Sequence, residues 1–378
     1  MKKSFLKILL LLISGFCFCQ SGKKKSNDYY LLIGTYTSGK SEGIYVYRFN
    51  TLTGQFNYVN KVATSNPSFL SVSPDEKYVY AVNENGQDKG SIAAFSFDKK
   101  SGSLQPLNKQ SSGGDHPCYV NIDRTGKWVV SGNYTGGSLA VLPVKADGSL
   151  LPASQVIRHE GNSINKDRQE KPHVHSTIFS PDYKYLFVPD LGLDKVMIYS
   201  FDTKTGKLQA ANPPFAATNP GSGPRHFVFH PSGKYAYLVQ EMSGMVNAYS
   251  YNNHGQLKSI QSISAIPADY HGSIGSADIH VSPDGKFLYV SNRGESNTIA
   301  IFSIDSNGKL KWIGHQSTLG SKPRNFNLDP SGNFLLVANQ DTDNIVIFKV
   351  DKKTGKLTVL AKQIEVGNPV CVKWIAVD

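Results

Sequence analysis

The chain repeats one unit about seven times. One copy reads NPSFLSVSPDEKYVYAVNEN at residues 66–85, another GPRHFVFHPSGKYAYLVQEM at 223–242, and a third KPRNFNLDPSGNFLLVANQD at 322–341. In each copy a tight turn precedes a run that alternates β-branched or aromatic residues with others, and a looser glycine turn follows further on. This pattern predicts four short strands and two turns per unit. The first turn usually carries a proline, at Pro74, Pro181, Pro231, Pro283 and Pro330.

A period near 50 residues with four strands per unit is typical of a β-propeller, an all-β fold. Six units begin near residues 67, 117, 174, 224, 276 and 323. The seventh is split, because NPVCVKWIAVD at the C-terminus has the signature of a first strand and residues 29–59 supply the other three. Pairing the two ends of the chain closes the ring and removes free sheet edges. We therefore expect residues 28–378 to form a single seven-bladed β-propeller with four antiparallel strands per blade.

The first nineteen residues lie outside the repeat. Lys2, Lys3 and Lys7 precede an apolar run at 8–13, which is typical of a secretory signal peptide and too short for a membrane span. We expect a signal peptide at 1–19, cleavage before Gln20 and a linker at 20–27, hence a periplasmic or extracellular protein. A lipid anchor on Cys17 or Cys19 is the alternative.

The formal charge of +11 overstates how basic the domain is. Six lysines precede residue 26, and without them 34 basic residues face 29 acidic ones, or +5. Nucleic-acid binding needs a concentrated basic face, and the remaining lysines cluster at turns, so no nucleic-acid partner is expected. After cleavage only Cys118 and Cys371 remain, and we expect two free, buried thiols. No metal-binding or cofactor motif is present, so neither a metal nor an organic cofactor is expected.

The repeat also predicts where a functional site lies. The start of each first strand and the end of each second strand meet at one edge of the blade, so seven such pairs ring one mouth of the channel. At the strand ends the ninth residue past the turn is polar in every blade, which indicates a structural role. The tenth residue varies, and architecture does not explain that variation. The tenth residues are Glu84, Tyr134, Leu191, Glu241, Arg293, Gln340 and, by equivalence, Tyr36.

The first-strand starts show the same contrast. His175, Arg225 and Arg324 occupy a place where the other blades carry small or apolar residues, namely Ser68, Cys118, Ala277 and Val370. With Glu241 and Arg293, they predict a mouth containing a base, a carboxylate and several guanidiniums, which suits an anionic ligand. Arg225 and Glu241 belong to one hairpin, so we expect a salt bridge between them.

Other side chains are expected to support this site. His173 is expected on the other side of the strand from His175, either as a supporting group or as a surface residue. We include Arg324, His173, His226, Tyr134 and Asn292 as candidate substrate-binding residues. The loop at 158–171 is longer than its counterparts and is expected to overhang the same mouth, as a flap or as surface decoration.

These segments resemble the seven-bladed propeller lactonase family, which includes the propeller-type 6-phosphogluconolactonases, and are similar to the fungal carboxy-muconate lactonizing enzymes. The resemblance rests on GTYT at 34–37, HPCYV at 116–120, PHVHS at 172–176, GSGPRHFVFHP at 221–231, SPDGKFLYVSNRG at 282–294 and KPRNFNLDPSG at 322–332. It covers the chain from about Tyr29 onward. The family's His, two Arg and Glu correspond to His175, Arg225, Arg293 and Glu241.

The resemblance implies a metal-independent lactonase that opens a sugar-type lactone to the hydroxy acid. Such chemistry needs a base for water and a positive site for the oxyanion. Either His175 or Glu241 can serve as the base, and His175 is favoured because arginines lower the basicity of Glu241. Two alternatives remain open: a muconate-type cycloisomerase, and a non-catalytic propeller that binds a ligand outside the cytoplasm.

Overall fold

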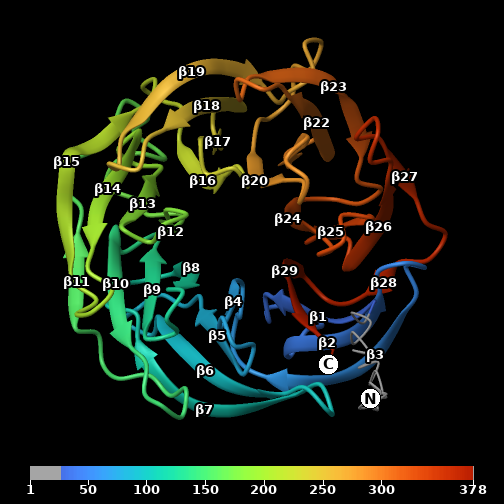
Figure 1. Cartoon of the computed structure of the whole chain (residues 1–378), viewed down its shortest axis with the longest axis horizontal. Helices are drawn as coiled ribbons and strands as arrows, with labels where there is room; N and C mark the ends of the chain where they lie inside the picture. Colours follow the sequence, from blue (N-terminus) through green and yellow to red (C-terminus); the bar gives the residue numbers. More distant parts are fainter. Residues whose placement is uncertain (1–26, 378) are drawn as a thin grey trace, which may run out of the picture.

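The computed structural model describes residues 27–377 as a ring of seven sheets around a central axis (Figure 1). All seven are antiparallel, and their innermost strands face the centre. The predicted seven-bladed β-propeller is thereby confirmed. The expected signal peptide, Cys17, Cys19 and nearly all of the expected linker lie outside the described residues. Among residues 27–377 no helix has the length and apolar character needed to cross a bilayer.

The blades are numbered along the chain, from the innermost strand outward. Blade 1 contains β29 (Pro369–Ala376), β1 (Asp28–Thr35), β2 (Gly43–Asn50) and β3 (Phe56–Ala63). Blade 2 contains β4 (Leu70–Val72), β5 (Tyr78–Asn83), β6 (Ser91–Asp98) and β7 (Ser103–Ser111). Blade 3 contains β8 (Pro117–Ile122), β9 (Trp128–Asn133), β10 (Ser138–Pro143) and β11 (Gln155–Arg158). Blade 4 contains β12 (Ile178–Phe179), β13 (Tyr185–Asp190), β14 (Lys195–Phe201) and β15 (Leu208–Ala217).

The other three blades follow the same plan. Blade 5 contains β16 (Pro224–Phe229), β17 (Tyr235–Gln240), β18 (Met245–Tyr251) and β19 (Leu257–Ser264). Blade 6 contains β20 (Ser276–Val281), β21 (Phe287–Asn292), β22 (Thr298–Ile304) and β23 (Leu310–Ser317). Blade 7 contains β24 (Pro323–Leu328), β25 (Phe334–Asn339) and β26 (Asn344–Val350), and its outer edge is divided between β27 (Leu357–Val359) and β28 (Ile364–Glu365).

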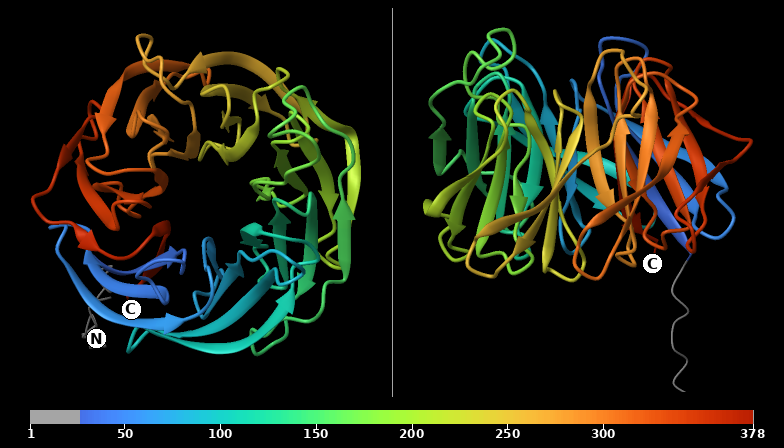
Figure 2. Two further views of the ribbon diagram at one scale, coloured as in Figure 1. Left: turned by 180° about the vertical axis from the view of Figure 1, so that it is seen from behind. Right: turned by 90° about the horizontal axis from the view of Figure 1, so that it is seen from above.

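The two ends of the chain close the ring inside blade 1. The C-terminal strand β29 takes the innermost place and pairs antiparallel with β1, for example Leu31 opposite Trp374 and Ile33 opposite Val372. Figure 2 shows the same closed ring from behind and from the side. Because the innermost position of blade 1 is filled from the other end of the chain, β1 is paired on both sides and blade 1 has four strands like its neighbours.

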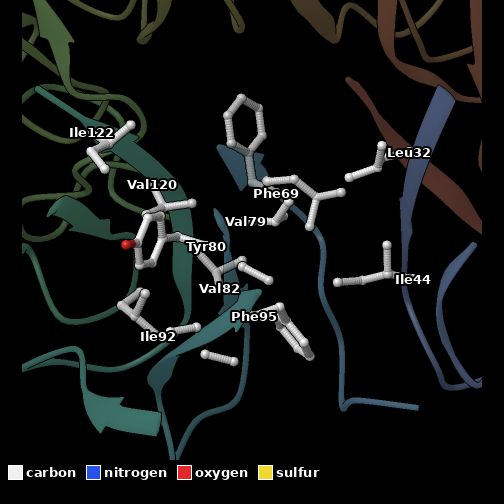
Figure 3. Packing of buried hydrophobic residues seen from close by; sticks show 14 of the residues in the cluster. Leu32, Ile44, Phe69, Val79, Tyr80, Val82, Ile92, Phe95, Val120 and Ile122 are labelled. Atoms are coloured by element: carbon white, nitrogen blue, oxygen red, sulfur yellow. The ribbon is translucent and has the colours of Figure 1, made fainter. Parts of the chain in front are cut away.

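Buried side chains pack between neighbouring blades. In the cluster of Figure 3, Leu32 and Ile44 of blade 1 pack with Phe69, Val79 and other residues of blade 2, and blade 3 adds Val120 and Ile122. Strand alternation produces this layer, since each sheet presents one face to each neighbour. Each fully buried aliphatic or aromatic side chain contributes about 1.5–3 kcal/mol. The ring is therefore held together by contacts between blades.

The first and second strands of five blades are interrupted at the same place. Register shifts fall at Cys118, Arg225, Ala277, Arg324 and Val370, beside the channel. Such bulges bend the strand and redirect a side chain, and they recur next to active sites. The first strands of blades 2 and 4 are short. β4 has three residues, and β12 has two residues preceded only by an isolated bridge between Val174 and Asp190. The bulges place the predicted site positions where the regular ladder is broken.

Candidate active site

The starts of the first strands come together around one narrow cavity, as the repeat predicts. Six of the seven predicted strand-start positions line it, together with four further side chains. The lining residues are Ser68, Phe69, Glu84, Cys118, His175, Arg225, His226, Arg324, Asn325 and Val370. Five are His, Arg or Glu residues, so this cavity concentrates the charged groups of the channel.

Glu241 is the centre of an ion cluster at this mouth. Its Oε2 lies 2.9 Å from Nε of Arg225 and 2.8 Å from Nη2 of Arg293, which confirms the expected salt bridge with Arg225. Its Oε1 accepts a hydrogen bond of 2.6 Å from Arg168. Arg225 also donates to the Ala277 carbonyl, and Arg293 to that of Gly275. One carboxylate therefore organises three guanidiniums from two blades and one loop.

Burial and charge set the protonation states of this cluster. Burial alone raises the pKa of Glu241, but Arg293 and Arg225 outweigh it and hold that pKa well below its usual range. Burial, followed by the neighbouring Arg293, lowers the pKa of Arg225 to about 10. Both groups therefore stay charged at neutral pH, and Glu241 is a weak base.

His175 lies beside this cluster and is almost fully buried. Burial, followed by Arg225, holds the pKa of its imidazole well below the usual range, so the ring is neutral at pH 7. Its Nε2 is 3.9 Å from Oε2 of Glu241, too long for a hydrogen bond, and its Nδ1 is 3.7 Å from the Cys118 sulfur. A neutral imidazole next to a carboxylate is suited to accept a proton and to be stabilised once charged.

The loop at 158–171 does reach the mouth. Besides its bond to Glu241, Arg168 donates a hydrogen bond of 3.1 Å to the Tyr134 hydroxyl. The loop is fixed at its base by Gln169, whose side chain is fully buried and donates to the Leu191 carbonyl. The long loop thus contributes a charged side chain to the site. The place of the loop in the sequence does not by itself indicate this contribution.

His173 does not point away from His175, and that expectation was wrong. Its ring stacks on Tyr134 with centroids 4.4 Å apart, and the ring of His175 meets the same tyrosine edge-on at 5.4 Å. Residues two apart in an extended strand share a face, which is the physical reason. The Nδ1 of His173 is 3.0 Å from the Tyr134 carbonyl, so this histidine holds Tyr134 against His175.

His226 lines the same cavity and is paired with an acid. Its Nδ1 lies 2.7 Å from Oδ1 of Asp278, and its ring meets that of His175 at 5.3 Å. Burial, followed by Arg225, lowers the pKa of His226 to about 4. Asp278 also binds His280 and Asn325, so His226 is held in place from the next two blades.

Asn292 holds a strand end rather than facing the cavity. Its amide donates 2.8 Å to the Ala265 carbonyl and its oxygen accepts from Ser276 at 2.6 Å, and the residue is completely buried. The same structural bond recurs in other blades, where Asn133 donates to the Ser112 carbonyl and Asn339 to the Thr318 carbonyl. This is the role that the repeated ninth position indicates.

Two further kinds of reactive group are the cysteine thiols and the side chains that could ligate a metal. Cys118 and Cys371 are buried free thiols, as expected. Within residues 27–377 no three His, Cys, Asp or Glu side chains are grouped so that they could hold a metal ion.

Sequence reasoning missed three polar groups near the cavity. Arg168 lies in a loop that is longer than its counterparts in the other blades, so the repeat offers no equivalent position to compare it with. Glu84 was visible as a varying tenth residue but received no role. Asp278 follows the compared strand start by one position, where the blades also carry His226 and Asn325, and comparing that next position would have found it.

Comparisons with known proteins agree with this geometry. The sequence model of the family described as "Lactonase, 7-bladed beta-propeller" matches residues 30–374. A protein of Formosa agariphila named 6-phosphogluconolactonase is 44% identical over 307 residues, 79% of this chain and 86% of its own. One of Bacillus subtilis with the same name is 39% identical over 347 residues, 91% and 97% of the two chains. The solved structure of a periplasmic gluconolactonase from Pseudomonas aeruginosa is 40% identical with a TM-score of 0.89, covering 93% and 100%.

Proposed function

Because the chain belongs to the seven-bladed β-propeller lactonase family, we propose that it is a lactonase that opens a sugar-type lactone at this mouth. The observation that carries the proposal is the neutral, buried His175 beside a carboxylate that is already neutralised by arginines. His175 supplies a proton acceptor and Arg225 supplies positive charge, and both side chains line the same narrow cavity. Ester hydrolysis needs both of these groups.

His175 acts as the general base in this proposal. It takes a proton from water as the water oxygen attacks the lactone carbonyl carbon. It then returns that proton to the ring oxygen when the carbon–oxygen bond breaks, giving the open hydroxy acid. Glu241 stabilises the transient imidazolium, while its own low pKa makes it the poorer base.

Arg225 and Arg293 stabilise the oxyanion that forms on the carbonyl oxygen. Each uses part of its guanidinium to hold Glu241 and a backbone carbonyl. Among residues 27–377, Nη2 of Arg225 and Nη1 of Arg293 donate no hydrogen bond, so each retains a donor for substrate. Removing one such donor typically costs about 10²–10³-fold in rate.

The remaining predicted side chains bind or position substrate. Tyr134 and His173 shape the wall beside His175, His226 borders the cavity from the channel side, and Arg324 contributes a further guanidinium. Asn292 supports the strand end that carries Arg293 and acts on substrate only through that residue. We propose neither metal nor organic cofactor for this chemistry.

An exported location for this chain agrees with the periplasmic location of one similar protein. The Pseudomonas aeruginosa protein is named a periplasmic gluconolactonase, and we propose that this chain also acts outside the cytoplasm after removal of residues 1–19. N-terminal sequencing of the protein recovered from a cell envelope fraction tests this directly. Sequence starting at Gln20 supports it, whereas a retained Met1 contradicts it.

A lactone panel tests the proposed function. Proton release is followed with D-glucono-1,5-lactone, its 6-phosphate, and a muconolactone, using wild type and Arg225→Ala. Wild-type turnover of a sugar lactone above the spontaneous rate, lost in Arg225→Ala, supports the proposal. Turnover of the muconolactone alone indicates the cycloisomerase, and turnover of none indicates a binding module.

A further inference from the structure

A second polar cluster lies on the arc of blades 7, 1 and 2, away from His175 and Glu241 on blades 4 and 5. The Tyr36 hydroxyl donates 2.9 Å to Oε2 of Glu84, and the Ser68 hydroxyl donates to the same oxygen. The guanidinium carbon of Arg324 sits 5.5 Å from the centre of the Tyr36 ring. Glu84, Ser68 and Arg324 all line the cavity that also contains His175.

The hydrogen-bonding capacity of this cluster is only partly used. Oε1 of Glu84 accepts no hydrogen bond from any of residues 27–377, and Arg324 forms neither a hydrogen bond nor an ion pair with them. Glu241 shows the opposite state, since both of its oxygens are engaged by arginines. Both side chains are part-buried on the wall of the cavity, so an open carboxylate oxygen and an open guanidinium there are available to hydrogen-bond a ligand.

The hydrogen-bonding groups of Glu84 and Arg324 determine which kind of ligand fits between them. A carboxylate oxygen accepts hydrogen bonds from hydroxyl groups, and a guanidinium donates to their oxygens. A phosphate or a second carboxylate would suit Arg324 but would be repelled by Glu84 beside it. Adjacent hydroxyl groups satisfy both members at once.

We propose that Glu84 and Arg324 form a subsite for the hydroxyl groups of a polyhydroxylated lactone, whose carbonyl end lies at His175 and Arg225. The inference rests on the sugar-lactone hydrolysis proposed above and adds the residues that recognise the hydroxyl groups of the substrate. It favours a sugar lactone over a muconolactone, which presents carboxylates instead of hydroxyls. Tyr36 and Ser68 are positioning residues here, because they orient Glu84 through Oε2 and leave Oε1 open.

Glu84 also joins blade 1 to blade 2 through Tyr36 and Ser68, and the test must separate that role from binding. Glu84→Gln keeps the shape of the side chain and an oxygen for Tyr36 and Ser68, so the fold is expected to survive. The readout is kcat/KM for two lactones with the same ring, D-glucono-1,5-lactone with its hydroxyls and δ-valerolactone without them. A purely structural role changes both values by the same factor.

We expect Glu84→Gln to lower kcat/KM for gluconolactone about 10- to 100-fold, the effect of losing one hydrogen bond to a charged group. Turnover of δ-valerolactone should change less than about twofold. Arg324→Gln should show the same selectivity. Gln340→Ala, the tenth residue of blade 7, is the matched control and should leave both substrates unchanged.

A second measurement covers the case in which δ-valerolactone turns over too slowly. D-glucitol carries the hydroxyls without a lactone, and its inhibition constant against gluconolactone hydrolysis should rise about tenfold or more in Glu84→Gln but not in Gln340→Ala. Equal losses on both lactones, or an unchanged inhibition constant, overturn the subsite. Loss in Arg324→Gln that is confined to the 6-phosphate indicates an anion site instead. Wild type that hydrolyses no lactone refutes the proposed function itself, a distinct outcome.

Discussion

Arg225 and Glu241 face each other across one hairpin, with Nε of the arginine 2.9 Å from Oε2 of the glutamate, and both side chains are almost completely buried. Because little of either charge is exposed, each depends on its partners. Glu241 is also paired with Arg293 and Arg168, and Arg225 also donates to the Ala277 carbonyl. A buried pair of this kind is poorly replaced on one side alone, because the remaining charge stays uncompensated.

Glu241→Gln should destabilise the protein as well as inactivate it. The amide leaves three guanidiniums around a neutral group, and we expect the free energy of unfolding to fall by about 3–5 kcal/mol. Urea unfolding followed by intrinsic fluorescence measures it. Glu42→Gln, which removes an exposed pair with Lys61, is the control and should leave the transition unchanged. An equally small effect of both variants would contradict the account.

Arg168→Ala should weaken substrate binding more than it slows chemistry. The side chain bridges the long loop to Glu241 and Tyr134, so its loss frees the loop while His175 and Arg225 remain in place. We expect KM to rise several-fold with kcat within about threefold of wild type. Steady-state kinetics with Lys166→Ala, an exposed change in the same loop, provides the comparison. A fall in kcat without a change in KM would assign Arg168 to the chemical step.

The acid side of the stability profile should depend on His226. In the folded state its pKa is about 4, whereas an unfolded histidine titrates near 6.5, so the unfolded chain binds more protons between these values. This contribution is complete above pH 6.5 and is lost as the pH falls toward 4, by about 3 kcal/mol. Around His226 lie the ionisable groups His175, Asp278 and Arg225.

The measurement is the urea midpoint of wild type and His226→Gln from pH 7 to pH 4. The variant should lose less stability over this range, since the group that must charge is absent. His254→Gln changes an exposed histidine and should follow the wild-type profile. Parallel profiles for wild type and His226→Gln would show that His226 is not buried in its neutral form.

Both thiols of the propeller should be inert in the folded protein. Burial raises the pKa of Cys371 to about 11 and also raises that of Cys118, so neither forms the reactive thiolate at pH 8. Iodoacetamide treatment followed by peptide mass analysis should find residues 118 and 371 unmodified in buffer and modified in urea. Alkylation of Cys118 in buffer would show that its thiolate forms in the folded protein despite burial.

The architecture could be predicted from the sequence because the same sequence unit occurs about seven times along the chain. Each copy carries the same turn and the same alternation, and the split seventh copy predicts the pairing of β29 with β1. Comparing the copies also singled out His175, Arg225, Glu241 and Arg293, because they occupy positions that differ between blades while the turns and strands around them are repeated. A repeated sequence can be compared with itself in this way, whereas a sequence without internal repeats cannot.

The rest of the site could not be predicted because it depends on loop geometry and on side-chain direction. Arg168 reaches Glu241 from a loop of unique length, and no spacing rule indicates how that loop folds. The partner of His226 is Asp278, 52 residues away on the next blade, and the contact follows from ring closure rather than from local pattern. Which oxygens remain open, as at Glu84, depends on the full set of hydrogen bonds.

The most direct test of the central claim is the initial rate of proton release from D-glucono-1,5-lactone by wild type, His175→Ala and Arg225→Ala. If neutral His175 activates water and Arg225 stabilises the oxyanion, each variant should lose about 10²–10⁴-fold in kcat while its circular dichroism spectrum stays native. Wild-type rates in both variants would show that the chemistry takes place elsewhere on the propeller.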